Sequence, residues 1–173
     1  MNLTPIPVLL QAVLALMATV AAVFDLRFRR IPNWLTISGL AVGLAGGNWR
    51  HALLGIGLAL AVYLPLYSLR AVGAGDVKLM AAIGSIAGPG NWLFIFAGSA
   101  VLGGILALGL VVWHGKLGAT LGNVGVILMS LLHLRAPHSV NPQIDVGNPL
   151  ALRLPHGISI AVAVLLFLLL HGK

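Results

Sequence analysis

Long segments without a charged side chain recur along this chain, and they constrain its fold more than any other feature. Residues 6–24, 52–69 and 91–113 are almost entirely apolar. About 20 apolar residues in a helix cross the hydrocarbon core of a bilayer, and a helix satisfies its backbone hydrogen bonds internally. The pattern therefore predicts an all-α, polytopic membrane helix bundle with about six transmembrane helices. The expected spans are residues 6–24, 34–48, 52–69, 77–89, 91–113 and 157–171.

The composition supports this class and excludes others. Charged residues make up 8% of the chain, whereas a soluble domain carries about 25%. The absence of cysteine excludes disulfides, thiol catalysis and cysteine-ligated zinc. The net charge of +7 comes from cations spread over the loops, a pattern that sets membrane topology, so we expect no nucleic-acid partner. We expect residues 1–173 to form one integral-membrane domain whose first span is not a removable signal peptide.

The distribution of lysine and arginine predicts an orientation, because cytoplasmic loops are enriched in these residues. The N-terminus is placed outside, and residues 117–134 are taken as interfacial or re-entrant on the cytoplasmic side. Eight of the ten cations then lie inside, and only Arg50 and Lys173 lie outside. If residues 117–134 cross the membrane instead, seven of the ten lie inside. The first arrangement is preferred, with the crossing of 117–134 as the alternative. Either arrangement puts Asp25 and Asp76 on the cytoplasmic side.

Small residues recur at four-residue spacing in several apolar segments. Gly43 and Gly47 form one such pair, and Gly55 and Ala59 form another. Small faces of this kind let helix backbones approach closely inside a membrane. We interpret them as packing faces within one chain, with a homodimer contact as the alternative.

The chain has only three acidic residues, none of them glutamate, and two lie at the edges of apolar segments. Asp25 stands in the stretch FDLRFRRIPN, and Asp76 stands in GAGDVKLMAAIG. A charged side chain in the hydrocarbon costs about 2.5–3.5 kcal/mol on insertion scales, so a retained carboxylate marks a candidate functional site. Each aspartate also has a structural alternative. Asp25 is placed to pair with Arg29 one helical turn on, and Asp76 is suited to cap a helix N-terminus.

The residues around the two aspartates have structural interpretations. Gly73 and Gly75 give the backbone freedom to bend and let a neighbouring segment approach closely. Lys78 adds a positive charge near Asp76. Pro32 ends one element, and we expect Asn33 to be the N-cap of the next helix.

Two carboxyl groups on one side of a membrane suit the hydrolysis of a peptide bond. When they lie a few ångströms apart they share one proton, since both cannot ionise easily. The ionised partner takes a proton from the attacking water, and the protonated partner polarises the carbonyl and later protonates the leaving amine. The pair acts together, so the sequence does not assign the general base. We expect no metal and no cofactor, since the histidines form no metal-binding motif; they are His51, His114, His133, His138, His156 and His171.

At these motifs the chain resembles the type IV prepilin peptidases, the A24 family of aspartic peptidases. The matching stretches are DLRFRRIPN at residues 25–33 and GAGDVKL at residues 73–79, and the likeness is greatest to the short TadV/CpaA-like form of the Tad/Flp pilus system. Residues 154–157, LPHG, resemble the Pro-Tyr/Phe-Gly element that opens the family's last helix, with His156 in place of the aromatic residue.

This resemblance implies an aspartic endopeptidase with Asp25 and Asp76 as its catalytic residues. Such an enzyme cuts the leader from type IV prepilins and pseudopilins at the cytoplasmic face of the bacterial inner membrane, for pilus assembly or protein secretion. Its partners are the substrate helix and the lipid bilayer. Longer family members carry an N-terminal domain with paired Cys-x-x-Cys motifs and also methylate the new N-terminus. The chain contains no cysteine, and we expect no N-methyltransferase activity.

Other functions could use the same two aspartates. A proton-coupled transporter would place them near the membrane midplane within an inverted repeat, and the sequence shows no such repeat. A non-catalytic assembly subunit would keep the fold without the chemistry. Presenilin-like proteases share Gly-x-Gly-Asp, but their Tyr-Asp and Pro-Ala-Leu elements do not occur in this sequence.

Overall fold

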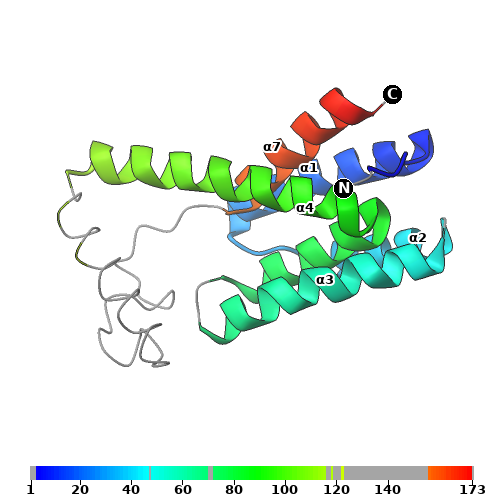
Figure 1. Cartoon of the computed structure of the whole chain (residues 1–173). Helices are drawn as coiled ribbons and strands as arrows, with labels where there is room; N and C mark the ends of the chain where they lie inside the picture. Colours follow the sequence, from blue (N-terminus) through cyan, green and yellow to red (C-terminus); the bar gives the residue numbers. More distant parts are fainter. Residues whose placement is uncertain are drawn as a thin grey trace.

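The computed structural model describes residues 3–46, 48–69, 72–115, 118, 122 and 156–172. This part of the chain is a bundle of helices without strands, as the sequence predicts (Figure 1). In chain order the helices are α1 (Val8–Phe28), α2 (Asn33–Ala45), α3 (Trp49–Ser68), α4 (Ala74–Trp113) and α7 (His156–His171).

Among the described helices, α1, α3 and α4 are long and apolar enough to cross a membrane. Helices α2 and α7 are apolar but shorter, with 13 and 16 residues, or about 20 and 24 Å at 1.5 Å per residue. The prediction of an all-α membrane helix bundle is confirmed, and the number of crossings stays a prediction. Segment 117–134, whose path decides that number, lies outside the described residues except for 118 and 122.

Helix α4 consists of two arms joined by a sharp turn at Gly88. The backbone there has φ 75° and ψ 171°, a conformation essentially restricted to glycine. The chain folds back at this point, because Trp92 Nε1 donates a hydrogen bond to the carbonyl of Met80 at 3.0 Å. In a straight helix those two residues would be about 18 Å apart. Figure 1 shows the chain reversing direction here, at the junction of the two spans predicted for this region.

The first arm of α4 forms the centre of the bundle. Residues 79–88 are all buried, and a helix buried on every side must be enclosed by other helices. Helix α4 packs against α2, α3 and α7, and α1 packs against α7. On the second arm, the ring of Trp92 stacks on Phe96 and meets the edge of Tyr63 from α3. The core therefore holds both arms of α4 in place against the surrounding helices.

The outer faces of the helices are apolar. Val8 and Leu169 are each 79% exposed, and Trp113 is 88% exposed. A monomeric soluble protein rarely exposes apolar surface on this scale, whereas lipid tails are as apolar as these side chains. The described helices therefore present a surface suited to a bilayer.

The small-residue faces pack helices of one chain together. A side chain added at Gly55 of α3 would overlap the carbonyl oxygen of Gly84 in α4, and one added at Gly43 of α2 would overlap Ser85. The intramolecular interpretation is confirmed at these contacts. A homodimer contact stays a prediction.

Candidate functional site

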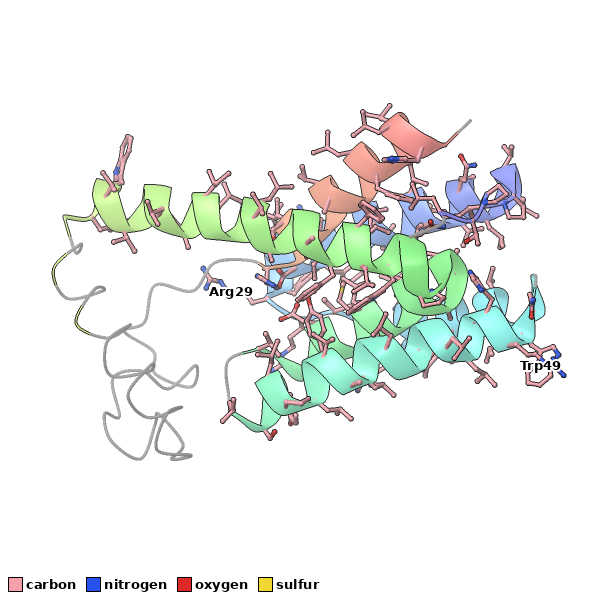
Figure 2. The ribbon with its side chains drawn as sticks, in the orientation of Figure 1. Arg29 and Trp49 are labelled. Atoms are coloured by element: carbon pink, nitrogen blue, oxygen red, sulfur yellow. The ribbon has the colours of Figure 1, made fainter. Side chains whose placement is uncertain are left out.

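Asp25 and Asp76 lie at the same end of the bundle. Asp25 is in the last turn of α1, and its backbone carbonyl accepts the N–H of Arg29 at 2.9 Å, where a left-handed residue closes the helix. Asp76 is in the first turn of α4, and the charges of the two carboxyl groups act on each other. Figure 2 shows Arg29 marking this end, and Trp49, which begins α3, at the opposite end.

The start of α7 holds the carboxylate of Asp25. The backbone N–H of Gly157 donates a hydrogen bond to Asp25 Oδ2 at 2.8 Å. The first N–H groups of a helix lack partners within the helix and carry partial positive charge, so they suit a carboxylate. The contact needs a glycine, because a Cβ at position 157 would lie 2.9 Å from Oδ2 and 3.0 Å from Asp25 Cβ. The start of α7 therefore fixes the side chain of Asp25, which lies in the last turn of α1.

Asp76 is not the N-cap residue of α4, the position predicted as its structural alternative, but it contributes to capping that helix from a position inside it. Gly73 is the N-cap and Asp76 is the third residue of the helix. From there its Oδ2 reaches back and accepts the N–H of Gly73 at 3.3 Å, which is one half of a capping box. Gly75 permits close approach of the connection between α1 and α2, because a Cβ there would lie 3.3 Å from the Cβ of Ile31. The first turn of α4 therefore fixes Asp76 beside that connection.

Asn33 and Lys78 join α2 to α4. The prediction that Asn33 caps α2 is wrong, because Pro32 is the N-cap and Asn33 lies one residue inside the helix. The side-chain Oδ1 of Asn33 accepts a hydrogen bond from Lys78 Nζ at 2.9 Å. The ammonium group of Lys78 is a charged donor, which makes a stronger hydrogen bond than a neutral backbone N–H. This accounts for the bond of Asn33 to Lys78 and not to the backbone of its own helix. The cation of Lys78 is thereby directed at α2.

Two further ionisable side chains interact electrostatically with Asp76. The imidazole of His156, the first residue of α7, interacts electrostatically with its carboxyl group, and so does the hydroxyl of Tyr63 from α3. Tyr63 is only 2% exposed. Sequence reasoning gave Tyr63 no role and left that of His156 open. The sequence signal that could have identified Tyr63 is its position inside an apolar segment, because a buried tyrosine hydroxyl needs a polar partner.

The arrangement can hold and transfer protons. Two carboxyl groups from different helices interact at the end of an apolar bundle, and each accepts a hydrogen bond from a backbone N–H. Backbone donors on rigid helix ends keep such groups oriented without side-chain movement. The geometry therefore suits general acid–base chemistry at the boundary between the bundle and the polar loops.

A protein-family model, described as the type IV leader peptidase family, matches residues 12–108, which is more than half of the chain. The matched region contains both aspartates and ends before α7. No curated protein and no solved structure matches the chain. The contact between Gly157 and Asp25 therefore comes from the structure alone.

Proposed function

Because the chain belongs to the type IV leader peptidase family and is thus a membrane protease, we propose that it is an aspartic endopeptidase for Flp-type prepilins and pseudopilins. The observation that carries this proposal is the placement of Asp25 and Asp76. They come from two different helices and interact at one end of the bundle.

The two carboxyl groups divide the chemistry between them. Sharing one proton, they form a pair with one ionised and one protonated member. The ionised member takes a proton from water as the water oxygen bonds to the scissile carbonyl carbon. The protonated member donates to the carbonyl oxygen, and as the C–N bond breaks a proton passes to the leaving nitrogen. The N–H groups of Gly157 and Gly73 keep the two side chains in place during these transfers.

The position of the site suits a bond at the edge of a membrane helix. A prepilin carries a basic leader before an apolar helix, and its scissile bond lies between the two. The aspartates lie at the end of an apolar bundle where Arg27, Arg29 and Arg30 also lie. A cluster of arginines supports a cytoplasmic location for this end. We propose the bacterial inner membrane, with the N-terminus outside and the substrate helix against the apolar surface of the enzyme.

The test is cleavage of a co-expressed Flp-type prepilin, read by gel shift and N-terminal sequencing. Asp25→Asn and Asp76→Asn keep side-chain size but cannot ionise, and a general acid or base contributes about 100- to 10,000-fold. We therefore expect both variants to lose detectable cleavage. Asp145→Asn changes the remaining acidic residue of the chain and is the matched control, with cleavage retained. Near-normal cleavage by either variant at equal protein level would show that the paired-carboxylate mechanism is wrong.

A further inference from the structure

A pocket of about 210 Å³ lies at the end of the bundle opposite the aspartates. It is lined by the segment before α1, by Gln11 of α1, by Asn91 of α4 and by the last turn of α7. Figure 1 shows the start of α1 and the end of α7 at the end of the bundle where α4 turns. Gln11 precedes Asp25 by 14 residues on α1, which is about 21 Å at 1.5 Å per residue. The pocket is therefore separate from the aspartate site.

Asn91 brings an unpaired acceptor to this pocket. The residue is fully buried, and its Nδ2 donates to the backbone carbonyls of Thr4 at 2.8 Å and Ala87 at 3.0 Å. Because a carbonyl oxygen only accepts, these two bonds decide which end of the amide faces them. Among the described residues, Oδ1 of Asn91 has no hydrogen-bond partner. Buried polar atoms of native proteins nearly always have one, so a donor from outside the chain is expected here.

Two other side chains of the pocket have the same arrangement. The Nε2 of Gln11 donates to the carbonyl of Ile6 at 2.7 Å, which leaves the amide oxygen as an acceptor. The Nδ1 of His171 lies 3.3 Å from the carbonyl oxygen of Phe167, so Nδ1 carries the hydrogen, and Nε2 of the neutral ring is an acceptor. All three side chains direct their donors at backbone carbonyls. The pocket therefore suits a ligand that donates hydrogen bonds.

The surroundings of the pocket are those of a lipid headgroup. The side chains next to it on α1 and α7 are exposed and apolar; they are Val8, Leu9, Leu169 and Leu170. Lipid tails are as apolar as these side chains and can cover them. None of the described residues that line the pocket is lysine or arginine, the side chains that usually bind a phosphate. The pocket therefore fits the terminal group of a headgroup better than its phosphate.

We propose that this pocket binds the primary ammonium headgroup of a phospholipid, the chemistry of phosphatidylethanolamine. A primary ammonium has three N–H donors, and the pocket offers three acceptors, which are Asn91 Oδ1, Gln11 Oε1 and His171 Nε2. The acyl chains then lie along the apolar surfaces of α1 and α7. A lipid bound in this way joins the start of the chain, the turn of α4 and the end of α7.

The first test measures lipid binding to the full chain, purified in detergent, by native mass spectrometry. The probes are phosphatidylethanolamine, phosphatidylcholine and phosphatidylglycerol. The trimethylammonium group of phosphatidylcholine carries the same charge but has no N–H donor. We expect one phosphatidylethanolamine to bind about tenfold more tightly than phosphatidylcholine, because charged hydrogen bonds are lost in the latter. Equal affinity for these two lipids, or a preference for phosphatidylglycerol, would overturn the proposal.

The second test locates the bound lipid with variants. His171→Phe keeps an aromatic ring beside Phe167 but removes the acceptor, and Gln11→Leu removes the amide. We expect each to weaken phosphatidylethanolamine binding about three- to tenfold. His114→Phe makes the same ring substitution at the C-terminal end of α4 and should bind this lipid as wild type does. Unchanged affinity in both pocket variants would contradict the assignment. If Gln11→Leu does not fold, His171→Phe decides alone.

The third test distinguishes a lipid from a soluble amine. The unfolding midpoint in detergent is measured with phosphatidylethanolamine and with ethanolammonium chloride, its headgroup amine, at the same concentration. We expect the lipid to raise the midpoint and the free amine to leave it unchanged, because the apolar surfaces of α1 and α7 hold the acyl chains. Equal stabilisation by the free amine would show that the ligand is not a lipid. None of the three tests measures prepilin cleavage, so their outcome is independent of the proposed function.

Discussion

Replacing Gly157 with alanine tests the hydrogen bond between α7 and α1. The added methyl carbon would lie 2.9 Å from Asp25 Oδ2 and 3.0 Å from Asp25 Cβ, whereas carbon atoms pack at about 3.5–4.0 Å. Relief of this contact moves the start of α7 by about 0.5–1 Å, which lengthens the 2.8 Å hydrogen bond beyond the usual limit of about 3.2 Å. A hydrogen bond to a charged group contributes about 1.5–3 kcal/mol. If that stabilisation orients Asp25 in the transition state, cleavage falls about 10- to 150-fold.

The assay is the initial rate of prepilin cleavage by purified enzyme in detergent. Gly104→Ala is the matched control, because a Cβ at position 104 would meet nothing within 4 Å. We expect the control to cleave within about twofold of wild type, since surface substitutions usually change stability by less than about 0.5 kcal/mol. A Gly157→Ala enzyme that also cleaves at the control rate would refute the argument that this N–H orients Asp25.

Three other predictions concern the contacts that hold the site. Lys78→Met should slow cleavage by less than about fivefold, because its bond to Asn33 is exposed to solvent. Adding Asn33→Ala to that variant should change the rate no further, because the two residues contribute through the same bond. Complete loss of cleavage in Lys78→Met would instead indicate that Lys78 takes a direct part in the chemistry. Gly88→Ala should lower the free energy of unfolding by about 1–3 kcal/mol, because alanine is strained at φ 75°, and an unchanged denaturation midpoint would contradict this. Trp92→Phe should lower it by about 0.5–1.5 kcal/mol through loss of the bond to the Met80 carbonyl, a value that chemical denaturation in detergent can check.

The helices could be predicted from the sequence because apolar runs set their approximate limits. Helix α3 covers the predicted span 52–69 and α7 covers 157–171, each to within a few residues. Helix α1 runs past residue 24 as far as Phe28. Hydropathy could not find that end, because polar side chains are tolerated where a helix leaves the hydrocarbon.

The partners of the site residues were much harder to predict. Asparagine is a good N-cap, so Asn33 was expected to cap its own helix, yet it accepts a bond from Lys78, 45 positions later. Asp76 likewise precedes an apolar run like a cap but lies inside the helix. The number of predicted crossings between Asp25 and Asp76 was enough to place both on the same side of the membrane. The atoms that they meet depend on packing between distant segments, which local propensity does not encode.

The contact between Gly157 and Asp25 also bears on the order in which the protein is made. It joins residues 132 positions apart, so the ribosome delivers α1 to α4 long before it delivers α7. A nascent chain holds both aspartates before it holds the N–H of Gly157 that fixes Asp25. The site is therefore completed only when α7 is made, and a nascent chain that lacks α7 carries the two aspartates without a finished site.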